Sequence, residues 1–182
     1  MFKSMWDSFT KILREKVAQK IQFRNIYRVE CWKPDGTLRW AEEIPNIVVN
    51  VGLNDVLDKY FKGVAYTAAH YVGITSATPV PNAADTMASH SGWTEVTDYD
   101  EADRPALTLG AVSAQSVNNS GNKAVYTINA TVTIGGAFVT TDDTKGGSAG
   151  TLYGVAAFTN GNRAAQDGDE LRVTCTLSAA SA

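Results

Sequence analysis

The sequence has few of the residues that most often carry chemistry or covalent cross-links. Its two cysteines, Cys31 and Cys175, lie far apart and form no CxxC pair, which gives no support to a disulfide or metal framework. We expect two buried or half-buried thiols in a protein made in a reducing cytosol. No HExxH, GxSxG or Walker motif occurs, and the glycine-rich segment 146–150 lacks the Gly-Lys-Ser/Thr that holds a phosphate.

Long apolar runs and an excess of positive charge are also missing. No run approaches the roughly 18 residues of a membrane span, and Lys3, Asp7 and Lys11 interrupt the region where a secretory signal has its apolar core. We therefore expect a soluble chain. The net charge of −3 and pI near 5.3 argue against nucleic acid as the main partner. The charge is uneven, because residues 1–24 carry six basic against two acidic residues, which leaves −7 for the remainder.

The N-terminal segment predicts an amphipathic helix over 4–21. Its apolar stripe recurs every three or four residues, at Trp6, Phe9, Leu13 and Val17. A basic helix of this kind can lie on a membrane surface, but the stripe is explained more simply by docking on another protein surface, either its own sheet or a neighbouring subunit. A detached helix of this length is marginal in water, so we predict that these four residues bind a partner.

The next segment predicts a hairpin and a second helix. Residues 24–33 alternate apolar and polar side chains, Pro34-Asp35-Gly36 favours a tight turn, and 37–43 should return antiparallel, which could bring Trp32 and Trp40 together. After Asn50, a potential cap, apolar residues follow helical spacing up to Gly63, which ends the helix. Residues 69–74 then read as a strand.

Residues 75–104 predict a long loop rich in Pro, Ser, Asp and Thr. Loops of this length tend to be functional or to lie over a partner, so Trp93, which should anchor the loop, and Tyr99 are candidate partner-binding residues. The acidic cluster 98–103 offers oxygen ligands for calcium, but its spacing does not match an EF-hand. We favour a solvated acidic turn and predict no metal and no cofactor.

The C-terminal part predicts antiparallel strands. In 122–141 (NKAVYTINATVTIGGAFVTT), apolar and polar residues alternate, which indicates a long half-buried strand that bends at Gly135-Gly136 and forms the central ladder. Strands are also expected over 107–116, 152–158 and 171–178. The predicted fold is mainly β, an antiparallel sandwich or barrel. Its parts are a helical arm 1–23 and a β-rich domain 24–182, composed of the hairpin and helix 24–74, the loop 75–104 and the sheet 105–180.

The sequence offers no candidate catalytic residues. His70 sits inside an expected strand and is better explained by packing, and neither it nor His90 pairs by spacing with a nucleophile and an acid. We therefore predict a protein that is not an enzyme.

The order of several short motifs resembles a family of small virion proteins of tailed bacteriophages. The matching pieces are YVGI at 71–74, the Pro/Asp/Thr loop, WTEVTDY at 93–99, and GDELRVTCTLS at 168–178, where Cys175 replaces a commoner aromatic residue. The resemblance implies a head-decoration, collar or tail protein of the virion, assembled in the bacterial cytoplasm. It implies no catalytic residues.

From this resemblance we expect a capsid decoration protein that binds the major capsid protein or other virion proteins, and a trimer or ring as its own assembly. Two alternatives remain: a tail or collar adaptor, and a carbohydrate-binding module, for which Trp93, Tyr99 and Tyr153 would have to form an exposed platform.

Overall fold

The computed structural model describes residues 21–66 and 69–181. This part is mainly β, with several antiparallel sheets and one helix. Its elements, in chain order, are β1 Ile21–Trp32, β2 Leu38–Pro45, β3 Ile47–Val48, α2 Asn50–Tyr60, β4 Tyr71–Thr75, β5 Ser116–Asn118, β6 Ala124–Thr127, β7 Val132–Ile134, β8 Gly136–Thr140, β9 Leu152–Ala157, β10 Arg163–Ala165 and β11 Glu170–Ser181. The helix predicted over 4–21 lies outside the described residues except for Ile21, which begins β1.

The two longest strands, β1 and β11, pair with each other along their whole length. Their antiparallel register runs from Ile21 opposite Ser181 to Trp32 opposite Glu170. On β1 the inner side chains Tyr27, Val29 and Cys31 are fully buried, as the alternation predicted; between them Arg28 is exposed, whereas Glu30 is buried in ion pairs with Arg28 and Lys123. This ladder is the backbone of a first sheet, in which β2 flanks β1 and both β5 and β6 pair with β11.

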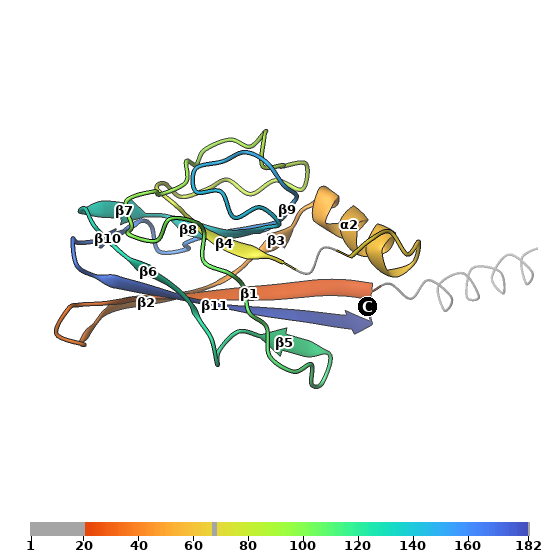
Figure 1. Cartoon of the computed structure of the whole chain (residues 1–182), viewed down its shortest axis with the longest axis horizontal. Helices are drawn as coiled ribbons and strands as arrows, with labels where there is room; N and C mark the ends of the chain where they lie inside the picture. The colour runs from red at the N-terminus through yellow and green to blue at the C-terminus, as the bar shows by residue number, and fades with distance from the viewer. Residues whose placement is uncertain (1–20, 67–68, 182) are drawn as a thin grey trace, which may run out of the picture.

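A second sheet, in the order β3-β9-β8-β4, lies above the first one in Figure 1. The inner faces of both sheets contribute to one core cluster, for example Tyr27 and Val173 from the first sheet and Val72 and Val139 from the second. Burial of these side chains between the sheets is the main stabilising contribution to the fold. The described strands form no closed barrel, so the barrel alternative is wrong.

The alternation predicted that the segment 122–141 forms a single central ladder, and this prediction is wrong. The segment forms three successive strands in three different sheets: β6 pairs with β11, β7 with β10, and β8 with β4 and β9. The break follows from Gly135, where a Cβ atom would lie 2.0 Å from the carbonyl carbon of Ala77. The chain can pass this close to another backbone only without a side chain, so the predicted bend at this glycine is confirmed.

Residues 107–116 do not form the strand that we expected. Residues 108–115 are all exposed, and none of them belongs to a strand of the two large sheets. They form a small hairpin with β5, closed by Ala114 and Gln115, which have φ angles of +48° and +58°. Ser113 and Ser116 exchange backbone hydrogen bonds of 2.9 Å across this turn, which we call the 113–116 turn. Figure 1 shows β5 projecting from the lower edge of the molecule.

The predicted turn at Pro34-Asp35-Gly36 is confirmed. Gly36 has φ +80° and donates to the carbonyl of Lys33 (2.9 Å), and β2 returns antiparallel to β1. The two tryptophans do not meet, because Trp40 lies opposite Cys31 and packs on Phe158 from the inner side, whereas Trp32 stacks with Arg172.

Candidate functional site

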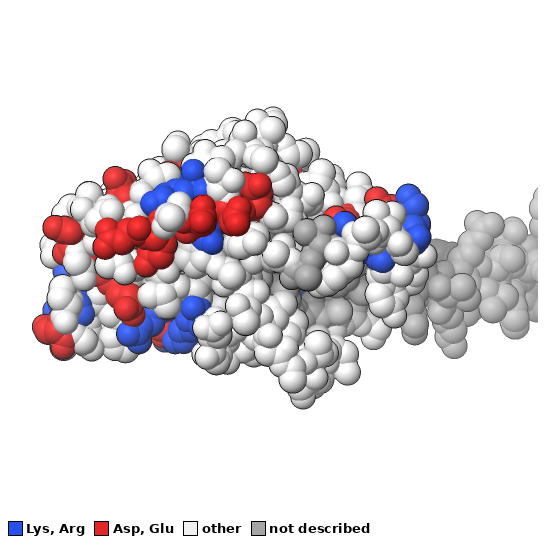
Figure 2. All heavy atoms as spheres, viewed as in Figure 1, with Lys and Arg blue, Asp and Glu red and all other residues white. Residues whose placement is uncertain are grey.

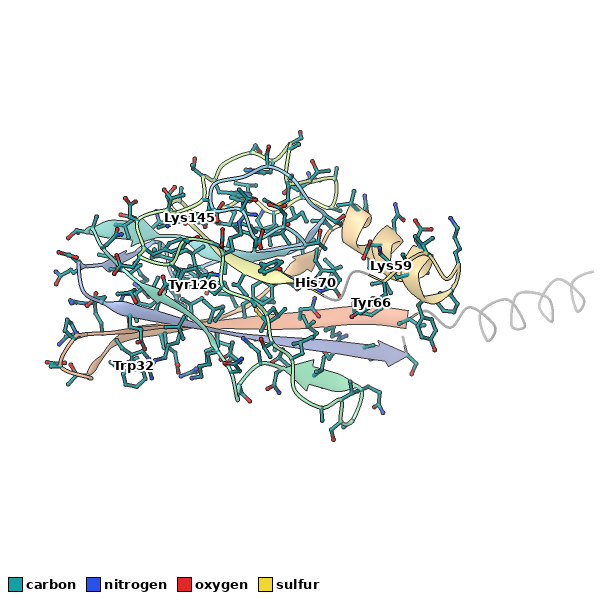
Figure 3. All side chains as sticks on the ribbon, viewed as in Figure 1. Trp32, Lys59, Tyr66, His70, Tyr126 and Lys145 are labelled. Carbon is teal, nitrogen blue, oxygen red and sulfur yellow. The ribbon has the colours of Figure 1, made fainter. Side chains whose placement is uncertain are left out.

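An apolar groove of about 520 Å³ opens beside α2, and we call it the α2 groove. Several distant parts of the chain build it: α2, the residues Tyr66 and His70, Leu107 and Leu109, and one residue each of the strands β8, β9 and β11. Its lining residues are Asp55, Val56, Lys59, Tyr60, Tyr66, His70, Leu107, Leu109, Val139, Tyr153 and Leu177. Figure 3 shows that Lys59, Tyr66 and His70 gather between α2 and the sheets. A pocket of this size and character is a usual place for an apolar ligand or a side-chain anchor of a partner.

The position of α2 depends on a glycine in its first turn. Gly52 is the buried residue of this helix, and a Cβ atom there would lie 2.6 Å from the carbonyl oxygen of Tyr153. At Gly52 the helix therefore approaches the backbone of β9 closely, with no side chain between them. The backbone N–H of Val49, which is the N-cap residue in place of the expected Asn50, also donates to that carbonyl (3.1 Å).

Val51 of α2 packs on a core cluster, but the apolar side chains near the C-terminal end of the helix are not packed as the sequence pattern suggested. Leu57, Tyr60 and Phe61 are 53%, 80% and 66% exposed, and Tyr66 in the following segment is 74% exposed. Tyr60 and Tyr66 line the groove, and Leu57, Phe61 and Val64 are exposed residues close to them in the chain; we call these five residues the apolar rim. Lys59 holds this rim in place, because its Nζ donates to the carbonyl of Ala65 (2.6 Å). Contiguous exposed apolar patches are typical of interaction surfaces.

The polar groups that line the groove belong to Asp55, Lys59, Tyr60, Tyr66, His70 and Tyr153. The ring of His70 packs edge-on against Tyr153, with 6.0 Å between the ring centroids. Burial lowers the pKa of His70, and the charge of Asp55 opposes this only in part, so the imidazole is neutral at pH 7. Burial also raises the pKa of Tyr153. Among the described residues, no three His, Cys, Asp or Glu side chains lie close enough together to hold a metal ion.

The surface that adjoins the groove carries no charge. Residues 105–122 contain no Asp, Glu, Lys or Arg, and Val112 within them is 75% exposed. Figure 2 shows charged side chains gathered over one end of the molecule and on α2, with an uncharged area below and between them. Because Leu109 belongs to both the groove and this area, the two form one surface of low polarity.

The predicted partner-binding residues of the long loop are buried. Trp93 is 7% exposed, stacked on His90 with 3.5 Å between ring centroids and packed against Phe138. Tyr99 is 1% exposed and meets Tyr126 edge-on at 5.0 Å. The prediction that Trp93 anchors the loop is confirmed. Both side chains are part of the interior, so neither can contact a partner in this conformation.

The carbohydrate-binding alternative requires an exposed platform of aromatic rings, and the positions of these side chains do not provide one. Trp93 and Tyr99 are buried, and Tyr153 lies at the floor of the α2 groove, so the three rings form no exposed aromatic surface. The acidic residues of 98–103 make protein contacts: Asp100 accepts a hydrogen bond from the side chain of Asn129, and Glu101 accepts one from the backbone N–H of Thr127.

The long loop is fixed by a buried guanidinium. Arg104 has a fully buried side chain that donates from Nε and Nη2 to the two carboxylate oxygens of Glu95 (2.8 and 2.7 Å). It also donates to the backbone carbonyls of Asp142 (2.8 Å) and Gly147 (2.6 Å). Two loops distant in sequence are thereby joined, and the segment 75–104 forms an ordered cover on the second sheet.

The remaining predicted partner residues, Trp6, Phe9, Leu13 and Val17, lie outside the described residues. The sequence did not single out the rim residues of α2 as a surface, because an apolar stripe at helical spacing ordinarily indicates a buried face. No described helix is long and apolar enough to span a membrane. Neither the comparison with protein-family models nor the search of curated proteins finds a match for this chain.

Proposed function

We propose that this chain is a non-enzymatic structural protein of a bacteriophage virion, a capsid decoration protein that binds and stabilises the outer shell. The observation that carries the proposal is the low-polarity surface formed by the α2 groove, its rim and residues 105–122. Such a surface is stabilised when another protein covers it. The motif order described above supplies the virion context.

The scaffold suits such a role. The two facing sheets, which we interpret as a β-sandwich, hold the groove between strand ends, and the buried Arg104–Glu95 pair fixes the long loop above them. A protein of this kind stabilises a shell by binding the assembled state at many equivalent positions, because each copy adds its binding free energy. The catalytic machinery of an enzyme has no part in this mechanism.

The proposal is tested on purified particles of the phage that encodes the chain. We expect the protein in the particles at a copy number that follows the number of shell subunits. Particles stripped of it should open at a lower temperature, and the purified protein should restore their stability. A small fixed number of copies at one vertex would instead favour the alternative, a tail or collar adaptor that forms a ring. Absence of the chain from purified particles would overturn both.

A further inference from the structure

We infer that the N-terminal segment, residues 4–20, of one copy binds in the α2 groove of a second copy. This inference deepens the proposed function by naming the partner that covers the groove. It rests on the proposed function for the idea of a repeated assembly. Three observations support it: the pattern of apolar residues in the segment, the place where the segment enters the described structure, and the distribution of charge.

The first observation is the match between the segment and the groove. The apolar residues Trp6, Phe9, Leu13 and Val17 have the spacing by which an amphipathic helix places anchors in an apolar groove. At 1.5 Å per residue, the predicted helix spans about 17 Å from Trp6 to Val17, whereas the part of α2 that lines the groove, Asp55 to Tyr60, spans about 8 Å. The groove wall on α2 therefore accommodates part of the apolar stripe of the segment.

The second observation is where the segment leaves the sheet. β1 is paired from its first residue, Ile21 opposite Ser181, and Asn25 lies opposite Leu177, which lines the groove. The segment therefore starts about 13 Å along the strand from the groove wall. No glycine or proline precedes Pro34 in the chain, so no turn residue is available between the segment and β1 to reverse the chain into its own groove. A neighbouring copy is thus the favoured recipient.

The third observation is charge. Residues 1–24 carry a net charge of +4, whereas the remainder of the chain carries −7; at the groove itself Asp55 lies beside Lys59, so the attraction comes from the net charge of the body. A basic segment is therefore attracted to the body of another copy, which increases the rate of encounter and favours one orientation.

The test uses the full chain and two single substitutions, Leu13→Lys in the segment and Tyr60→Lys on the groove rim. Tyr60 is largely exposed, so the second variant should keep the fold. We expect the wild-type chain to self-associate in light scattering, and each variant to raise the dissociation constant about 30-fold, the effect of losing one interface anchor. Matched controls that add the same charge elsewhere, Gln19→Lys and Val80→Lys, should associate like the wild type.

Mixing the two variants separates the possible arrangements. If the segment binds a second copy, Tyr60→Lys chains supply an intact segment and Leu13→Lys chains an intact groove, so the mixture should form heterodimers that neither variant forms alone. If the wild-type chain is monomeric, the inference is refuted. This holds if residues 4–20 are protected from protease by the chain's own groove, and it holds equally if they are cleaved freely. Self-association that neither variant weakens refutes it as well.

The self-association test and the test of the proposed function can fail separately. Particle binding is measured in parallel for the monomeric variants: if binding to the shell persists while self-association is lost, the proposed function stands and the segment acts between copies. If the variants lose self-association as expected but the wild-type protein does not bind to particles, this inference stands and the proposed function is refuted.

Discussion

Replacing Arg104 by methionine should destabilise the protein strongly, because it leaves a buried carboxylate without its cation. The Arg104 side chain is fully buried and that of Glu95 is 7% exposed. Breaking a buried ion pair by removing one partner costs about 3–5 kcal/mol. We expect the lower end of this range, since Glu95 keeps a hydrogen bond from the backbone N–H of Gly146 (2.9 Å). Against a total stability of about 5–15 kcal/mol, this is a large loss.

The measurement is urea unfolding at pH 7, together with the melting temperature, which should fall by about 6–12 °C at 2–4 °C per kcal/mol. Adding Glu95→Gln to Arg104→Met should recover part of the loss, because the double variant no longer buries an unpaired charge. The control is Lys62→Met, which removes an exposed pair with Asp58 and should cost at most about 1 kcal/mol. If Arg104→Met costs no more than this control, the pair does not hold the long loop, and the reasoning is refuted.

Three further predictions concern the turn, the thiols and the groove histidine. Replacing Ala114-Gln115 by Asn-Gly should raise the free energy of unfolding by about 1–2 kcal/mol in urea titrations, because both residues have positive φ; an unchanged value would contradict the turn geometry. Cys31 and Cys175 are buried, and burial raises the pKa of Cys31 to about 12, so a thiol reagent at pH 8 should label neither until urea unfolds the chain. The pKa of His70 is lowered, so the unfolded state binds the proton more readily; its contribution to stability is present above about pH 6.5 and is lost as the pH falls toward the folded pKa. His70→Asn should reduce the pH dependence of unfolding between pH 7.5 and 5, and an unaltered slope would contradict this assignment.

Alternation in the sequence identified which side chains face the core but not which strands are neighbours. Tyr126, Ile128 and Ile134 are all buried, as the pattern of 122–141 required, although they belong to parts of the chain that enter different sheets. All three sheets contribute side chains to the same core cluster, so a chain that crosses from one to another keeps its apolar side inward. The pairing partners lie far away in sequence, and no local signal specifies them.

The α2 groove was beyond the reach of sequence reasoning for a similar reason. The helix was predicted, with Gly63 as the residue that ends it, but α2 ends earlier, at Tyr60, with Phe61 as its C-cap. Periodicity shows that Leu57, Tyr60 and Phe61 share a face but not what covers that face. The groove exists because Gly52 sets α2 against β9 while Leu109 and Leu177 arrive from other parts of the chain.

The pairing of β1 with β11 bears on how the protein is made. β1 is synthesised before the other described strands, but β11, which pairs with its whole length, is made after all of them, with paired positions up to 160 residues apart. Formation of this ladder requires closure of a loop that includes nearly the whole chain, which slows folding relative to proteins built from local contacts. During synthesis β1 has only β2 as a partner, so a nascent chain interrupted before residue 170 presents an incomplete sheet to chaperones and proteases.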